Sequence, residues 1–237
     1  MKKLFTALAV ATLLLSACGI QQNTEDNQSE ENKSNNESKQ NENNKQKENE
    51  KQDEKDKHKV TKKNGVTYVD GHVFVNKKID LPKDYAPGEN ATARNQLNKL
   101  IQDARNQDLD LVFRSGYRSY ESQEQLYKDY VARDGEEAAN QYSATPGNSE
   151  HQTGLAFDVG SDTATDDFRS SFGDTDEGKW MEKHAHEYGF IIRYLEGKED
   201  ITGYQYEPWH LRYVGKDLAQ KIHQKNVTLE EYFDYGY

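Results

Sequence analysis

Three side chains have types and a spacing that could hold a zinc ion for hydrolysis. His151 and Asp158 flank Gly154, and His210 follows in a later segment of the chain. A hydrolytic zinc site takes three protein ligands from His, Asp or Glu and keeps one position open for water. If His151 lies on a loop that turns at Gly154 into a strand with Asp158, and if His210 lies on a neighbouring strand, the three side chains can converge.

Glu207 lies three residues before His210 and is the candidate general base. On a straight strand, residues i and i+3 face opposite sides. Pro208 disfavours a straight strand at this point. A bend there would bring the Glu207 carboxylate to the same site as His210, where it could accept a proton from the attacking water.

These residue types also have ordinary structural interpretations. A histidine is more often a surface or hydrogen-bonded residue than a metal ligand, and Trp209 is more often a packing residue than a substrate contact. His184 and His186 lie two residues apart on a predicted helix, where they face different directions, so we interpret both as structural. Spacing alone is therefore weak support for a metal site.

Interleaved helices and strands must position these residues. Strands are predicted over 66–75 (two strands around a turn at Asp70-Gly71), 109–113, 155–159, 190–194 and 209–214. Helices are predicted over 90–107, about 120–133 (capped by Ser119, with Leu126, Tyr127, Tyr130 and Val131 inward), 136–142, 176–188 and 216–224, and a last helix opens at Thr228. The pattern predicts an α+β fold, a small and mostly antiparallel sheet with helices around it.

A polar segment separates this domain from the start of the chain. From Gln21 to Lys59 there is no aliphatic or aromatic residue, no Met and no Cys, so nothing there can be buried to offset the entropy of ordering. We predict a disordered tether over 18–59 and one folded domain over 60–237. The whole chain of 237 residues carries a net charge of −11, and residues 60–237 keep −10 of it. So acidic a domain is a poor binder of nucleic acid, because phosphate contacts need clustered Lys and Arg.

The first residues have the pattern of a targeting signal. Lys2 and Lys3 precede an apolar run over 4–15, which is too short for a permanent membrane span and fits a secretory signal. The string Leu-Ser-Ala-Cys at 15–18 resembles the bacterial lipobox. That resemblance implies a signal peptide over 1–17 and a lipid on Cys18, which is the only cysteine in the chain. An ordinary signal peptide with a chance cysteine is the alternative.

Three segments together resemble the VanY-type zinc carboxypeptidases, which are D-alanyl-D-alanine carboxypeptidases and their close L,D-carboxypeptidase relatives. Ser149 to Asp158 reads S-x-H-x-x-G-x-A-x-D, and Glu207 to His210 reads E-x-W-H. Ser115 to Gln123, S-G-Y-R-S-Y-x-x-Q, is similar to the substrate-side motif of that family. The resemblance covers about residues 91–213 and implies the α+β zinc-peptidase fold shared with D-Ala-D-Ala dipeptidases and the hedgehog signalling domain.

The resemblance also implies a role for each matching residue. It implies His151, Asp158 and His210 as the zinc ligands and Glu207 as the general base that activates the water nucleophile. Arg118 matches the residue that stabilises developing negative charge or holds the substrate carboxylate; taken alone, it could be a surface arginine.

Two further positions match the substrate pocket of that family, and the resemblance extends to the reaction. It implies that Gln123 and Ser149 line the substrate pocket. The implied reaction is removal of the C-terminal D-alanine from a peptidoglycan stem peptide. Together with the lipobox, this predicts a lipid-anchored enzyme on the outer face of the cell membrane, and we predict that it is a monomer. The motifs are common to D,D- and L,D-carboxypeptidases. A zinc endopeptidase or amidase of the peptide network and a non-catalytic wall-binding lipoprotein are the alternatives.

Overall fold

Two antiparallel sheets organise residues 57–237, the residues that the computed structural model describes. The three-stranded sheet has the order β1 (Val60–Lys63), β2 (Val66–Val69) and β3 (His72–Val73). The four-stranded sheet has the order β4 (Val112–Ser115), β5 (Ala156–Gly160), β7 (Glu207–Tyr213) and β6 (Phe190–Tyr194), with every neighbouring pair antiparallel. The predicted α+β class with a small antiparallel sheet is confirmed.

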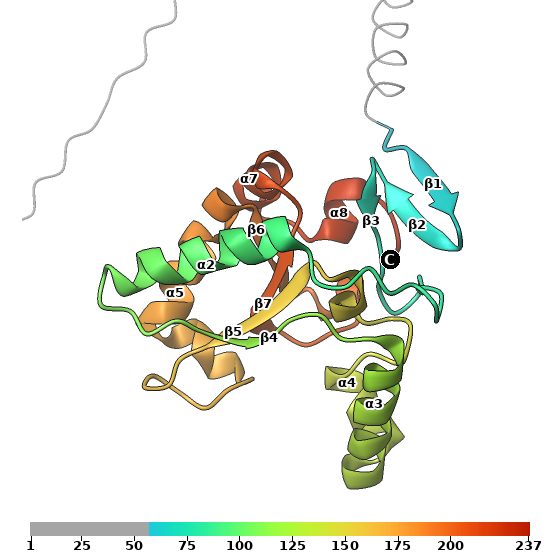
Figure 1. Cartoon of the computed structure of the whole chain (residues 1–237), viewed down its shortest axis with the longest axis horizontal. Helices are drawn as coiled ribbons and strands as arrows, with labels where there is room; N and C mark the ends of the chain where they lie inside the picture. The colour runs from blue at the N-terminus through green and yellow to red at the C-terminus, as the bar shows by residue number, and fades with distance from the viewer. Residues whose placement is uncertain (1–56) are drawn as a thin grey trace, which may run out of the picture. The chain divides into compact units, whose positions relative to one another are not determined.

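Helices surround these sheets (Figure 1). The α-helices are α2 (Ala91–Arg105), α3 (Tyr120–Asp134), α4 (Glu136–Tyr142), α5 (Asp176–His184), α6 (Glu199–Thr202), α7 (Lys216–Lys225) and α8 (Leu229–Phe233). Short 3-10 helices form at η1 (Glu150–Thr153), η2 (Ser170–Asp174) and η3 (Ala185–Tyr188). Within residues 57–237, no helix combines the length and the apolar character that crossing a membrane requires.

The two faces of the four-stranded sheet differ in chemistry. Phe157 and Val159 on β5, with Trp209 and Leu211 on β7, belong to the main apolar core under α2 and α5. Because side chains alternate along a strand, the intervening residues point to the opposite face. That alternation puts Asp158 and His210 on the face away from this core, and the register sets them directly opposite each other on neighbouring strands.

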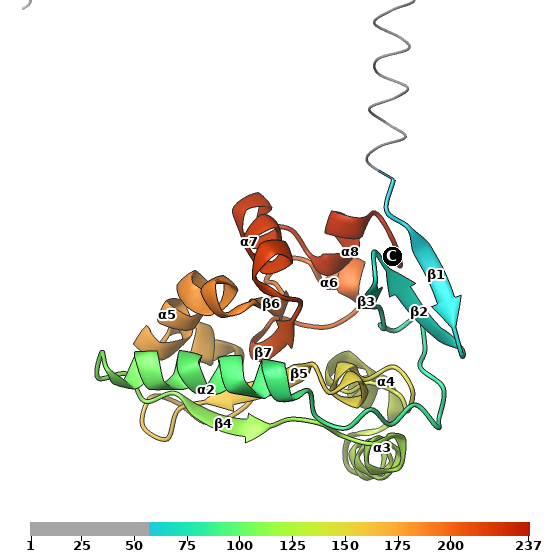
Figure 2. The same cartoon turned by 45° about the horizontal axis from the view of Figure 1, so that its top comes forward.

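A second apolar core joins α7 and α8 to β6 and the N-terminal hairpin. It contains Ile191, Ile222, Phe233 and Phe74, all buried. Figure 2 shows α8 next to β3 of the hairpin, α7 next to β6, and α2 running along β4 and β5. A third, smaller apolar cluster is formed by Val66, Val73, Val75 and Leu81.

Local sequence signals predict most element ends correctly. Asn90, Ser119 and Thr228 each cap a helix with the side chain, and Thr228 forms a reciprocal capping box with Glu231. Gly189, at φ +90°, ends η3 directly after the predicted helix end at residue 188. The buried residues of α2 follow helical spacing: Ala93, Leu97, Leu100, Ile101 and Ala104.

Two expectations about the elements are wrong, and strand β1 was not predicted. The strand predicted over 109–113 is found further along the chain, as β4 over Val112–Ser115. Its partner β5 ends at Gly160, opposite Val112, so the residues before Val112 have no strand to pair with. Strand β1 was not predicted, since its four residues are all exposed. The inward residues predicted for α3 are only half-buried, because this helix packs on α4 beside the sheet and buries Gln123 alone.

The compact unit begins at His58, two residues before the predicted domain boundary. His58 Nδ1 lies 2.7 Å from Asp70 Oδ2, and its ring packs against Tyr232 and Phe233. The backbone N–H of Lys59 donates to Asp70 Oδ1 at 2.7 Å. The predicted signal peptide, Cys18 and the tether up to residue 56 lie outside the described residues.

Candidate metal centre

The three predicted metal ligands come together on the polar face of the four-stranded sheet. Asp158 on β5 and His210 on β7 face each other across the strands, and His151 comes from η1 beside them. Gly154, at φ +70°, ends η1 and turns the chain into β5. A Cβ atom at this glycine would collide with the carbonyl of Gly88, so the turn requires glycine.

The ligand atoms of these residues are close enough to share one metal ion. One ligand atom from each of His151, Asp158 and His210 lies within 4.8 Å of the others, and all three residues are buried. Nε2 of His151 is 3.1 Å from Asp158 Oδ2, and Nδ1 of His210 is 3.1 Å from Asp158 Oδ1. Asp158 Oδ1 has no hydrogen-bond partner among the described residues. Two imidazoles and a buried carboxylate with an unsatisfied oxygen are the donor set that zinc prefers.

The remaining ring nitrogens of both histidines point at oxygens. Nδ1 of His151 lies 2.8 Å from the carbonyl oxygen of Gly116, which fixes Nε2 as the free ligand atom. Nε2 of His210 points at the Glu150 carboxylate, 3.6 Å from Oε2. Outer partners of this kind orient metal-binding histidines.

Protonation states differ between the two histidines. Burial lowers the pKa of His151, against the opposing effect of Asp158. For His210, burial also lowers the pKa, but the carboxylates of Asp158 and Glu150 outweigh burial and raise the pKa to about 9. A metal ion must displace the proton from His210, so metal binding at this centre is coupled to proton release.

Glu207 reaches the same centre because the pairing of β6 with β7 is irregular. Ile192 pairs with Leu211 while Tyr194 pairs with Glu207, so β7 has extra residues, Pro208 among them, between the two pairs. The expected bend is confirmed, and Glu207 Oε2 lies 3.9 Å from His210 Nδ1. Burial raises the pKa of Glu207 to about 8 against the opposing charge of His210. A carboxyl group with a pKa near neutrality suits proton transfer in both directions.

Arg118 lies beside the centre and is held by its neighbours. Its Nη1 donates to Gln123 Oε1 at 2.8 Å, and its Nη2 lies 3.2 Å from Ser115 Oγ. Its backbone N–H donates to the carbonyl of His151. Gln123, predicted as a pocket residue, is only 1% exposed, and its amide also donates to the carbonyl of Ala144. Gln123 therefore orients the arginine as well as lining the site.

A cavity of about 440 Å³ opens over these residues. Its size is that of a small-molecule site. Ser149 lines it together with the centre, and does not use its hydroxyl to cap η1. Phe168 and Arg169, from the long loop after β5, lie on its wall. All predicted site residues between 57 and 237 meet at this cavity: Arg118, Gln123, Ser149, His151, Asp158, Glu207 and His210.

The sequence analysis missed several residues around the centre. Glu150 is adjacent to the predicted ligand His151, but a glutamate at this position is expected to be exposed. Its burial depends on its pairing with two buried arginines, which the sequence does not show. Tyr194 lies with its ring 5.1 Å from that of His210, and Tyr204 packs against Tyr194 at 4.6 Å. His184 and His186 lie away from the cavity, as their structural interpretation predicts: His184 contacts Glu187, and His186 stacks on His223.

Comparisons with known proteins decide the family. Residues 88–216 match the VanY family, described as D-alanyl-D-alanine carboxypeptidase. This chain belongs to that family. A putative carboxypeptidase of Bacillus subtilis, YodJ, is 41% identical over 68% of this chain and 66% of its own length. The chain spans 36% of a D-alanyl-D-alanine carboxypeptidase of Enterococcus faecium, at 43% identity.

Solved structures of VanY relatives share the fold. The LdcB LD-carboxypeptidase is 46% identical, with a TM-score of 0.68 over 74% of this chain and 95% of that chain. A vancomycin-resistance D,D-pentapeptidase VanY variant in complex with Zn(II) is 32% identical, with a TM-score of 0.58 over 67% of this chain and 96% of that chain. The peptidase fold that the sequence motifs imply is therefore confirmed.

Proposed function

We propose that this VanY-family protein is a zinc-dependent carboxypeptidase that removes the C-terminal D-alanine from peptidoglycan stem peptides. The observation that carries the proposal is the convergence of three buried ligand atoms within 4.8 Å, with the Glu207 carboxylate 3.9 Å from one of the ligands. The Zn(II) complex of the related VanY structure supports the choice of metal.

The chain supplies binding, orientation and proton transfer. Zinc, held by His151, Asp158 and His210, would act as a Lewis acid and lower the pKa of water. Glu207 accepts the proton of the attacking water and delivers it to the leaving amine. The guanidinium of Arg118, fixed by Gln123 and Ser115, lies where it can pair with a carboxylate or a developing oxyanion. The site uses no acyl-enzyme serine, so a β-lactam has no covalent target in it.

We further propose that the bond cleaved is the L,D bond of a tetrapeptide stem. The identity to the LD-carboxypeptidase LdcB is 46%, against 32% to the D,D-pentapeptidase VanY, and this difference supports the choice.

One experiment tests both proposals. The zinc-loaded protein is incubated with a defined tetrapeptide stem, a pentapeptide stem and a cross-linked dimer, and the products are identified by mass. Release of D-alanine from the tetrapeptide is expected. Release from the pentapeptide alone would make it a D,D-carboxypeptidase. Cleavage of the dimer into two stems would favour the endopeptidase alternative, and binding of all three substrates without any product would favour the wall-binding one.

We also propose that the mature protein is a monomer anchored by a lipid on Cys18 to the outer face of the cell membrane. The lipobox-like string at 15–18 and the polar segment after it support this proposal. Cys18→Ala is expected to release the protein or leave the signal uncleaved. If this variant fractionates with membranes at the mature mass of the parent, the anchor is wrong. The mass of the detergent-solubilised protein by light scattering tests the monomer.

A further inference from the structure

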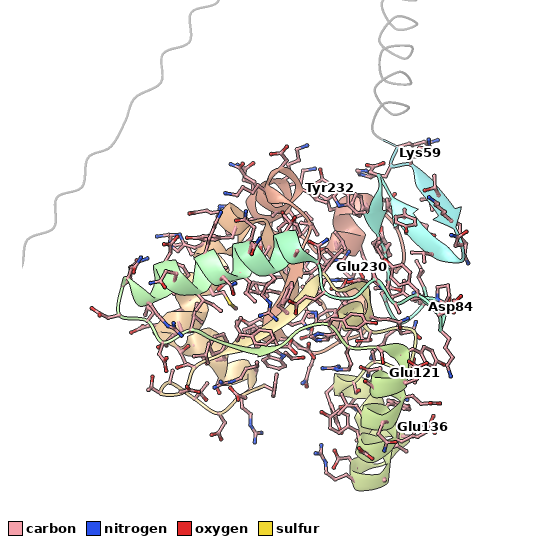
Figure 3. The ribbon with its side chains drawn as sticks, viewed as in Figure 1. Lys59, Asp84, Glu121, Glu136, Glu230 and Tyr232 are labelled. Carbon is pink, nitrogen blue, oxygen red and sulfur yellow. The ribbon has the colours of Figure 1, made fainter. Side chains whose placement is uncertain are left out.

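A second cluster of buried charges lies directly behind the metal centre. It consists of Glu150 on η1, Arg193 on β6, Arg212 on β7 and Glu230 on α8, none of them more than 2% exposed. Figure 3 labels Glu230 on α8. The two carboxylates and the two guanidinium groups balance in charge. We refer to these four residues as the ion-pair cluster.

Glu150 is where the ion-pair cluster meets the metal centre. Its Oε1 accepts hydrogen bonds from Arg193 Nε and Arg212 Nη1, both at 2.7 Å. Its Oε2 lies 3.6 Å from His210 Nε2. Neither of these two atoms has a hydrogen-bond partner among the described residues. One oxygen is therefore fixed by two arginines, and the other is aimed at a metal ligand.

We propose that Glu150 is a positioning residue that holds His210 in the orientation and tautomer needed to bind the metal through Nδ1. The proposal rests on the zinc site of the proposed function. A proton on Nε2 of His210 points to Oε2 of Glu150, which leaves the Nδ1 lone pair toward Asp158 and the metal. A carboxylate in this outer position both orients the ring and raises its basicity as a ligand.

The surrounding charges explain why Glu150 can serve this role. Two guanidinium groups donate hydrogen bonds to its Oε1, both at 2.7 Å, so the arginines hold the carboxylate as an acceptor. The arginines are themselves held, since Arg193 makes two hydrogen bonds to Glu230 at 2.7 and 2.8 Å and Arg212 donates to the carbonyl of Val73.

Replacing Glu150 by glutamine gives a specific geometric conflict. The amide oxygen of the glutamine must face the two arginines, because its NH₂ group cannot accept their hydrogen bonds. The NH₂ group then faces His210 Nε2 and donates to it. That contact favours the His210 tautomer with its proton on Nδ1, which opposes metal binding through this atom.

Glu230 offers a matched control. It is the other carboxylate of the ion-pair cluster, it is equally buried, and Glu230→Gln changes the cluster charge by the same amount. Its hydrogen bonds go to Arg193 and Asn76 and not to a metal ligand. A purely electrostatic or structural role of Glu150 predicts the same outcome for both variants.

The experiment compares the parent with Glu150→Gln and Glu230→Gln. Zinc affinity is measured by chelator competition. In the zinc-loaded proteins, NMR records the imidazole ¹⁵N and ring N–H signals of His210. For Glu150→Gln we expect zinc affinity to fall about 10–100-fold, the usual effect of losing an outer partner. In the parent we expect an Nε2–H signal from His210, and in Glu150→Gln this signal is expected to disappear or shift. For Glu230→Gln we expect an unchanged His210 signal and affinity within about 3-fold of the parent, since no metal ligand loses its outer partner.

A charge-balanced variant covers the case in which Glu150→Gln does not fold. Glu150→Gln with Arg212→Gln restores the neutrality of the ion-pair cluster, and the same loss of affinity and of the His210 signal is expected. Equal zinc affinities for the Glu150 and Glu230 variants, or an unmoved His210 signal in the double variant, would overturn the proposal. A parent that binds no zinc would instead overturn the proposed function.

Discussion

Two groups of buried charges lie in contact in this molecule and differ in how they are paired. In the ion-pair cluster, Arg193 and Arg212 share one oxygen of Glu150, and Glu230 binds Arg193 with both of its oxygens. In the metal centre, Oδ1 of Asp158 has no hydrogen-bond partner among the described residues, and between the two groups Oε2 of Glu150 and Nε2 of His210 face each other without one. Burying polar atoms without partners costs stability. The contrast indicates that the arginine pairs are arranged for the fold and the metal centre for a ligand, with Glu150 in contact with both.

The pKa values follow the same division. The two arginines keep the pKa of Glu150 well below neutrality, so this carboxylate holds one charge state. At the metal centre, burial raises the pKa of Glu207 to about 8, so this carboxyl group can exchange protons with water and substrate. Groups with pKa values shifted in this way gather at functional sites.

The largest expected effect comes from removing a metal ligand. His151→Ala, Asp158→Ala and His210→Ala should each lose the single bound zinc ion and, with it, turnover, because three ligands are the minimum of a hydrolytic site. Metal content by elemental analysis and D-alanine release are the measurements. His184→Ala is the control, since this histidine lies away from the cavity and contacts Glu187. Full zinc occupancy in all three ligand variants would rule out the site.

Removal of the proton acceptor should separate binding from chemistry. Glu207→Gln keeps the shape of the side chain but cannot take a proton, so zinc and stem peptide should still bind. Turnover should fall toward the upper end of the 10²–10⁴-fold range of general acid–base groups, because one residue serves both proton transfers. Single-turnover hydrolysis and zinc content measure the two effects. Near-normal turnover would remove Glu207 from the mechanism.

Glu230, the carboxylate of the ion-pair cluster that contacts no metal ligand, should matter for stability rather than for chemistry. Glu230→Gln removes one of the two carboxylate partners of Arg193 and leaves the buried cluster with one excess positive charge, and breaking a buried pair in this way costs about 3–5 kcal/mol. Glu124→Gln is the contrast. Its partner Lys128 lies four residues on along α3 at 3.3 Å, and both side chains are exposed. That change should cost about 0.5 kcal/mol or less. Urea unfolding of the two variants tests the difference, and equal losses would contradict it.

Arg118 shares one feature with each group of charges. Like the residues of the ion-pair cluster it is held by protein hydrogen bonds, and like those of the metal centre it lines the cavity. Arg118→Ala should raise KM and lower kcat together, since its charge meets both the substrate and the transition state. The loss of a charged hydrogen bond is worth about 1.5–3 kcal/mol, which is about 10–100-fold in kcat/KM. Gln123→Leu should give a smaller loss, because it removes a support of the guanidinium and not the charge. A change confined to KM would make Arg118 a binding residue only.

The metal centre was predictable from the sequence, and the ion-pair cluster was not. The spacing of its residues alone was weak support, and the prediction of His151, Asp158, Glu207 and His210 came from the resemblance of their short segments to the VanY-type motifs. Even the approach of Glu207 to His210 could be expected, because Pro208 signals an irregular strand. The supporting charges carry no such signal. Arg193 and Glu230 look like exposed residues of a strand and a helix, and only the packing of α8 against β6 buries them.

Local rules likewise predicted the helix caps but not how exposed each helix would be. Ser119 caps α3 as predicted, but the apolar residues of α3 stay half-buried because the helix packs on α4 beside the sheet. Burial of that kind depends on tertiary neighbours, which helical periodicity does not contain. For the same reason, the boundary of the folded unit at His58 could not be predicted, since its partner Asp70 lies on the far side of a hairpin.

The smallest expected effect concerns this pair of His58 and Asp70, which is the exposed counterpart of the buried ion pairs. The His58 side chain is 26% exposed and that of Asp70 43%, so the pair is worth about 0–1 kcal/mol.

Deleting residues 21–56 should leave the free energy of unfolding unchanged, because this segment has no apolar side chain to bury. Extending the deletion to Lys59 removes the pair and the packing of the His58 ring on Phe233, and should cost about 1 kcal/mol. Urea unfolding of the two truncated proteins gives both numbers. A loss greater than about 1 kcal/mol already in the shorter deletion, which is the scale of a typical point mutation, would show that the polar segment stabilises the domain.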